Sequence, residues 1–108
     1  MFKPLPSVML PKKVQGLIFF TCKNYEIQPK EIRDRINSLI SDICGKNDTG
    51  GFYQKALFEI LTTDKGINSI ALSCFCSPRS LCNWRKAFYE AAESYGVIPK
   101  QNFNRKDF

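Results

Sequence analysis

Residues 66–86 constrain the fold more than any other part of the chain, because they contain two helical patterns separated by a sharp break. After the break, Ser77 has the side chain of a helix N-cap and Pro78 suits the first helical position. The apolar residues on both sides recur at i, i+3, i+4 and i+7, the spacing of one helical face: Ile67, Ile70, Ala71 and Cys74 before it, and Leu81, Trp84, Phe88, Ala91, Ala92 and Tyr95 after it. The sequence therefore predicts two helices joined by a corner of about three residues.

Two alternatives remain open for this stretch. Residues 69–76 are short and weakly alternating, which is also compatible with a buried strand. No second strong strand lies nearby to pair with it, and an isolated strand cannot satisfy its backbone hydrogen bonds. The other alternative is a pair of helices that only contributes to the core.

Two helices that meet at such a corner resemble the helix-turn-helix DNA-binding family. Members of this family have a small residue in the first helix, a hydrophobic residue just after the turn and apolar residues along the inner face of the second helix. In this chain the corresponding positions are occupied by Ala71, Cys76, Leu81 and Trp84. Residues 77–81 are similar to the usual start of the family's recognition helix. Phe75 departs from the family, which generally has glycine there, and this predicts a wider or differently angled turn. The narrower resemblance is to small regulators of bacterial or phage mobile elements and to the promoter-reading domain of sigma factors.

The whole chain is predicted to be one all-α domain, residues 1–108, of about five helices containing the helix-turn-helix. Helices are expected over residues 11–23, 29–44, 52–62 and 78–95, with a short one from residue 67 to the corner. Residues 14–20 are also compatible with a strand, because of their β-branched and aromatic content. We expect residues 1–10 to form an extended, loosely ordered arm, residues 67–95 the helix-turn-helix, and residues 97–108 a basic tail. Residues 52–62 are placed to pack across the pair of helices.

The chain carries a formal net charge of +6, and all of the excess lies in its two terminal segments. Residues 1–13 contribute +3, residues 14–78 contribute zero and residues 79–108 contribute +3. The last segment contains most of the second helix of the corner. This asymmetry favours a polyanionic partner. A solvated surface with basic tails is the alternative explanation.

Several classes of protein are disfavoured. The chain has no histidine, so it lacks the usual general base near neutral pH, and it has no paired-acid or glycine-rich phosphate motif. We therefore expect no enzyme and no cofactor. No apolar run is long enough to span a membrane, and prolines near the start replace the apolar run of an export signal.

Five cysteines without an export signal predict reduced thiols in the cytoplasm. The alternative is a metal site of Cys74, Cys76 and Cys82, with Cys22 or Cys44 as the fourth ligand. The Cys-x-Cys spacing is a poor match to zinc sites.

The resemblance implies sequence-specific binding of double-stranded DNA and a role in transcription regulation. It implies that Arg79 contacts guanine and Asn83 adenine, whereas Ser77, Ser80, Arg85 and Lys86 make phosphate or supporting contacts. The expected partners are double-stranded DNA and either a second copy of the chain or RNA polymerase. The alternative function is a small helical adaptor for another protein, anchored by aromatic residues: Phe19, Phe20, Phe103 and Phe108.

Overall fold

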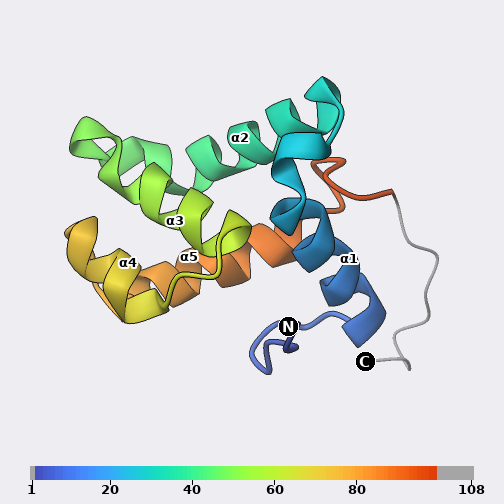
Figure 1. Cartoon of the computed structure of the whole chain (residues 1–108), viewed down its shortest axis with the longest axis horizontal. Coiled ribbons are helices and arrows are strands. Elements are labelled where there is room, and N and C mark those ends of the chain that lie inside the picture. The colour runs from blue at the N-terminus through green and yellow to red at the C-terminus, as the bar shows by residue number, and fades with distance from the viewer. Residues whose placement is uncertain (1, 100–108) are drawn as a thin grey trace.

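The computed structural model describes residues 2–99 and confirms the all-α fold (Figure 1). Five α-helices run in the order α1 (Lys12–Lys23), α2 (Lys30–Cys44), α3 (Phe52–Thr62), α4 (Ile67–Ser73) and α5 (Pro78–Ala91). Three single 3-10 turns connect the first helices: Tyr25–Ile27, Gly45–Asn47 and Thr49–Gly51. The described part of the chain contains no β-strand, so the strand alternatives for residues 14–20 and 69–76 were wrong. None of its helices is long and apolar enough to cross a membrane.

The helices enclose two neighbouring apolar clusters. The larger joins α1, α2, α3 and α5, and includes Ile18, Ile36, Leu57 and Phe88, none of which is exposed. The smaller joins α3, α4 and α5 through five buried residues: Ala56, Ile70, Ala71, Cys74 and Leu81. Figure 1 shows α4 and the start of α5 at one end of the molecule and α1 at the other end. The corner predicted from the sequence therefore lies at one end of the molecule, supported by its own small core.

The N-terminal arm is held against α1, although we expected it to be loosely ordered. Gln15 of α1 is only 3% exposed, and its Oε1 accepts a hydrogen bond of 2.7 Å from the backbone N–H of Leu5. Its Nε2 donates to the carbonyl oxygens of Leu10 at 3.0 Å and Val8 at 3.4 Å. Val8 is itself buried in the larger cluster. One buried amide thus satisfies several backbone groups of the arm, as buried polar groups require.

The end of α5 differs from the prediction. The helix ends at Ala91 and not near Tyr95, because the chain then passes through turns to Gly96, which has a φ of 76°. Such a positive φ favours glycine. The turn directs Val97 and Ile98 into the larger cluster, so the segment expected to be a basic tail from residue 97 begins with two core residues. Residues 100–108 of that tail, including Phe103 and Phe108, lie outside the described residues.

Candidate nucleic-acid interface

The corner between α4 and α5 is closed by a backbone geometry that glycine normally supplies. Phe75 has a φ of 57°, the left-handed region that non-glycine residues rarely adopt. The N–H of Cys76 donates to the carbonyl oxygen of Ala71 at 3.0 Å, the long hydrogen bond that ends many helices. Phe75 thus takes the left-handed conformation itself, and the corner closes although no glycine is present.

The start of α5 is well defined and faces solvent. The Ser77 Oγ accepts a hydrogen bond of 3.0 Å from the Ser80 N–H and donates one of 2.9 Å to Ser80 Oγ. Pro78 occupies the first turn, as predicted, and no acidic residue lies there. A helix N-terminus has free N–H groups and a partial positive charge, both of which favour an anion such as a phosphate.

Helix α3 packs across the α4–α5 pair, as expected from its position in the sequence. Ala56 of α3 is buried with Ile70, Ala71 and Leu81, and Ile60 packs against the same cluster. At the start of α3, the Tyr53 ring lies against the partly buried Trp84 of α5, with centroids 5.0 Å apart and planes tilted by 39°. These contacts fix the direction in which α5 presents its outer face.

Three of the predicted DNA-binding residues share that outer face. Arg79, Asn83 and Lys86 follow the spacing i, i+4 and i+7, which brings their side chains to one side of the helix. Arg79 and Asn83 are exposed, and Lys86 is partly exposed. None of the three forms an ion pair or a side-chain hydrogen bond with the rest of residues 2–99. Their polar groups are therefore available to a partner. Glu90, one turn further on, is exposed as well.

Arg85 does not belong to this face, although we predicted that it would contact phosphate or support such contacts. It is partly buried and lines a pocket with Tyr89 of α5, Phe19 of α1 and Leu5 of the arm. The helical spacing of the sequence already indicates the inner position of Arg85, because Arg85 follows Leu81 by four residues and precedes Phe88 by three. Both of those residues are buried, so Arg85 lies on the inner side of the helix.

The cysteines do not form a metal centre in the described part of the chain. Cys74 is buried in the smaller cluster, Cys76 is partly buried and Cys82 is exposed, and all are free thiols. Within residues 2–99 no three histidine, cysteine or acidic residues are placed to hold a metal ion. Burial raises the pKa of the Cys76 thiol, and the charge of Cys74 raises it further.

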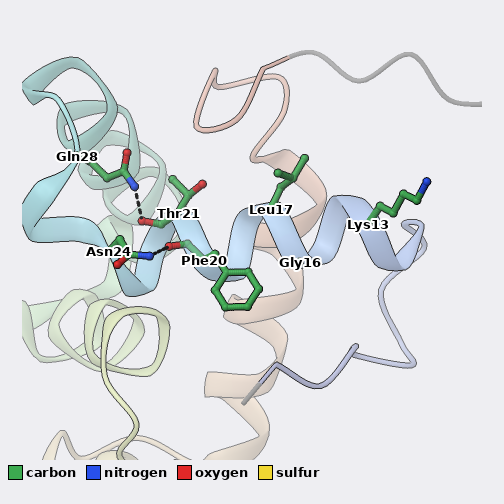
Figure 2. A pocket seen from close by; sticks show the side chains of 7 residues that line it. All are labelled: Lys13, Gly16, Leu17, Phe20, Thr21, Asn24 and Gln28. Carbon is green, nitrogen blue, oxygen red and sulfur yellow. Dashed lines mark hydrogen bonds between the residues drawn. The ribbon is translucent and has the colours of Figure 1, made fainter.

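A second surface feature lies on α1, at the opposite end of the molecule from the corner. A groove of about 640 Å³ lies along this helix and is lined by Lys13, Gly16, Leu17, Phe20, Thr21, Asn24 and Gln28. Figure 2 shows how these residues lie along α1 and the turn after it. Phe20 is 56% exposed and Leu17 is also exposed. Asn24 Nδ2 and Gln28 Nε2 donate to the carbonyl oxygens of Phe20 and Thr21, at 2.8 and 3.2 Å. The only charged residue of this groove is Lys13.

Comparison with known proteins identifies no relative: no protein-family model matches the chain, and no curated protein sequence and no solved structure matches it significantly. Its function must therefore be inferred from its own residues.

Proposed function

We propose that this protein binds double-stranded DNA sequence-specifically, with the first turns of α5 in the major groove, and that it regulates transcription in the cytoplasm. The observation that carries the proposal is the unpaired set of Arg79, Asn83 and Lys86 on one face of α5, of which Arg79 and Asn83 are exposed and Lys86 is partly exposed. An α-helix fits the major groove, where each base pair presents a distinct set of hydrogen-bonding groups. The proposed activity is binding, with no catalytic step.

Each residue of the face has a role that follows from its chemistry. The Arg79 guanidinium matches the two acceptors of guanine, and the Asn83 amide matches the donor and acceptor of adenine. Lys86 is a compact charge suited to a phosphate. Ser77 and Ser80 lie at the helix N-terminus, where their hydroxyls and the free N–H groups favour a second phosphate.

The charges on α5 support a DNA contact at the start of this helix and limit how far along the helix the contact extends. Residues 79–108 carry a net +3, and the first turn of α5 has no acid to repel a phosphate. The exposed carboxylate of Glu90 lies on the same side as Lys86, one turn further along. We therefore propose that the DNA contact ends before Glu90. One recognition helix contacts one DNA half-site, so a second copy of the chain or RNA polymerase would supply the remaining contacts with the DNA.

Selection of bound duplexes from a random DNA pool tests the proposal. The parent protein should enrich one motif, and Arg79→Ala should lose the preference at one position of it. Lys30→Ala removes one positive charge from an exposed position at the start of α2 and is the matched control, which should enrich the parent motif. A pool that remains random with the parent protein excludes sequence-specific binding.

The groove on α1 supports a second candidate function, that of an adaptor for another protein. Its apolar residues, Leu17 and Phe20, fit the apolar stripe of a helix, and Lys13 favours acidic residues beside that stripe. We therefore assign the groove to an acidic amphipathic helix of a partner protein.

A synthetic helix with leucines at i, i+4 and i+7 and flanking glutamates is a suitable probe for the groove. It should bind the parent and not Phe20→Ser, whereas the same helix with flanking lysines should not bind. Equal binding of both peptides, or equal binding to Phe20→Ser, excludes this use of the groove.

A further inference from the structure

A second and more enclosed pocket lies where the N-terminal arm, α1, α3 and α5 meet. Its volume is about 320 Å³. Four of its lining residues are apolar, namely Leu5, Phe19, Ile60 and Leu61, and three are polar, namely Lys3, Arg85 and Tyr89. The lining thus combines an apolar wall with two cations and a phenol. Neither the adaptor groove nor the outer face of α5 shares any of these residues.

The two cations of the pocket lack an anion. No acidic residue lines it, and neither Lys3 nor Arg85 forms an ion pair within residues 2–99. The Arg85 Nε is buried and has no hydrogen-bond acceptor, and its Nη2 reaches only the Cys82 sulfur, at 4.0 Å. A buried donor without an acceptor is unfavourable, and so are two positive charges that share one pocket. An anion bound there would relieve both.

Tyr89 adds a neutral donor to the same pocket. Burial raises the pKa of its phenol to about 12, against a smaller lowering by Arg85, so the hydroxyl keeps its proton at neutral pH. The hydroxyl forms no hydrogen bond to the rest of the described residues. It is therefore free to donate to an oxygen anion.

We propose that this pocket binds a small organic carboxylate with an apolar body. Arg85 and Lys3 would hold the carboxylate, since a guanidinium matches its two oxygens, and Tyr89 would donate a further hydrogen bond. The apolar body would lie against Leu5, Phe19, Ile60 and Leu61. The pocket lies at the lower end of the size range of small-molecule sites, about 300–1,000 Å³, which limits the body to one ring or a short chain. A nucleic-acid phosphate is a poorer fit, because it has no apolar part to cover this wall.

Binding of benzoate to the full chain, measured by isothermal titration calorimetry, tests the proposal. Two probes separate its components: benzyl alcohol keeps the ring without the charge, and inorganic phosphate keeps the charge without the ring. Benzoate should bind at one saturable site, with each of the other two weaker by about tenfold or more, because each lacks one half of the interaction.

Variants locate the site. Arg85→Gln should weaken benzoate binding by about tenfold or more, because it removes the bidentate charged partner. Lys30→Gln, which removes one positive charge from an exposed position at the start of α2, is the matched control and should bind benzoate like the parent. If Arg85→Gln fails to fold, as judged by circular dichroism, Lys3→Gln and Tyr89→Phe should each weaken binding.

Three outcomes would overturn the proposal. The first is no saturable binding of benzoate. The second is equal affinity for benzoate and benzyl alcohol, which would show an apolar pocket without an anion site. The third is phosphate binding as tight as benzoate binding, which would show an adventitious ion only. The result does not depend on whether the protein binds DNA.

Discussion

Phe75 and Phe52 face each other edge to face across the corner, with ring centroids 5.2 Å apart and an interplanar angle of 87°. Phe75 lies in the turn before α5, has a left-handed φ and is 73% exposed, whereas Phe52 is the first residue of α3. The backbone of Phe75 is unfavourable for a side chain, and its ring contact offsets part of that cost. The corner is therefore maintained by a side-chain contact at a position where glycine would need none.

This relationship predicts the order of two substitutions at one position. Phe75→Ala and Phe75→Gly both remove the ring, but only glycine adopts a φ of 57° without strain. Phe75→Ala should therefore be less stable than Phe75→Gly by about 1 kcal/mol. Urea denaturation followed by circular dichroism measures the difference. An alanine variant as stable as the glycine variant would show that the turn relaxes to another geometry.

The contact between Tyr53 and Trp84 leads to a second prediction. Trp84 packs against both apolar clusters but is only partly buried. Trp84→Ala should therefore reduce the free energy of unfolding by about 3 kcal/mol, the lower end of the range for replacing a buried large aromatic residue by alanine. A double-mutant cycle with Tyr53→Ala should give a coupling energy of about 0.5–1.5 kcal/mol. Met9→Ala, at an exposed residue of the arm, is a control and should change stability little. Additive effects of the two aromatic substitutions would exclude a stabilising ring contact.

The buried thiols predict a loss of stability at alkaline pH. Burial raises the pKa of Cys22 and of Cys44 from the ordinary 9.0 to about 12, with the charges of Asp48 and Cys76 adding to the effect on Cys44. Because both values are higher in the folded chain, the folded state retains protons that the unfolded state loses. The stabilisation is complete below pH 9 and decreases as the pH rises toward 12.

Unfolding midpoints measured at a series of pH values, under reducing conditions, test this. The Cys22→Ala/Cys44→Ala variant is the comparison: it should be less stable at neutral pH and lose less stability between pH 9 and 12 than the parent. Parallel pH profiles for the two proteins would show that other groups, such as lysines, account for the alkaline loss.

Much of the fold could be predicted from local sequence patterns. The structure differs from the prediction where contacts between residues distant in sequence decide the conformation. Helix α3 has the predicted bounds, because its apolar spacing is bordered by glycines and by a break at residues 63–66. Its N-terminal cap was not predicted. Asp48 accepts hydrogen bonds from the N–H groups of Tyr53 and Gln54, at 2.8 and 2.9 Å, from across a turn. Such a cap depends on the path of the loop and not on the residue next to the helix.

The end of α5 and the N-terminal arm were misjudged for a related reason. Tyr95 continues the apolar spacing of α5, but Val97 and Ile98 enter the core, and this requires the turn at Gly96. Helical periodicity alone cannot show whether more apolar surface is buried by continuing the helix to Tyr95 or by ending it early and turning at Gly96. In the arm, the bonds of Gln15 join residues five to ten positions apart, and no local pattern marks them.

The candidate site was predicted in part. The corner and the outer positions of α5 follow from helical spacing, which places Arg79, Asn83 and Lys86 together. The resemblance to helix-turn-helix proteins suggested a role for Arg85 as well, although the same spacing places it inside. The pocket around Arg85 could not be predicted, because its walls come from the arm and three separate helices.

The last prediction separates the two sides of α5 by their effect on DNA binding. Arg79→Ala and Asn83→Ala should each relax the preference at one base pair and weaken specific binding by about 1–3 kcal/mol. Lys86→Ala should weaken binding to all duplexes alike and lower the salt slope by about one unit, because it removes a phosphate contact. Arg85→Gln should leave base preference unchanged, since Arg85 lies on the inner side of the helix. Titrations of specific and scrambled duplexes at several salt concentrations measure all four variants. If Arg79→Ala and Asn83→Ala bind every duplex as tightly as the parent, the outer face of α5 does not contact DNA bases.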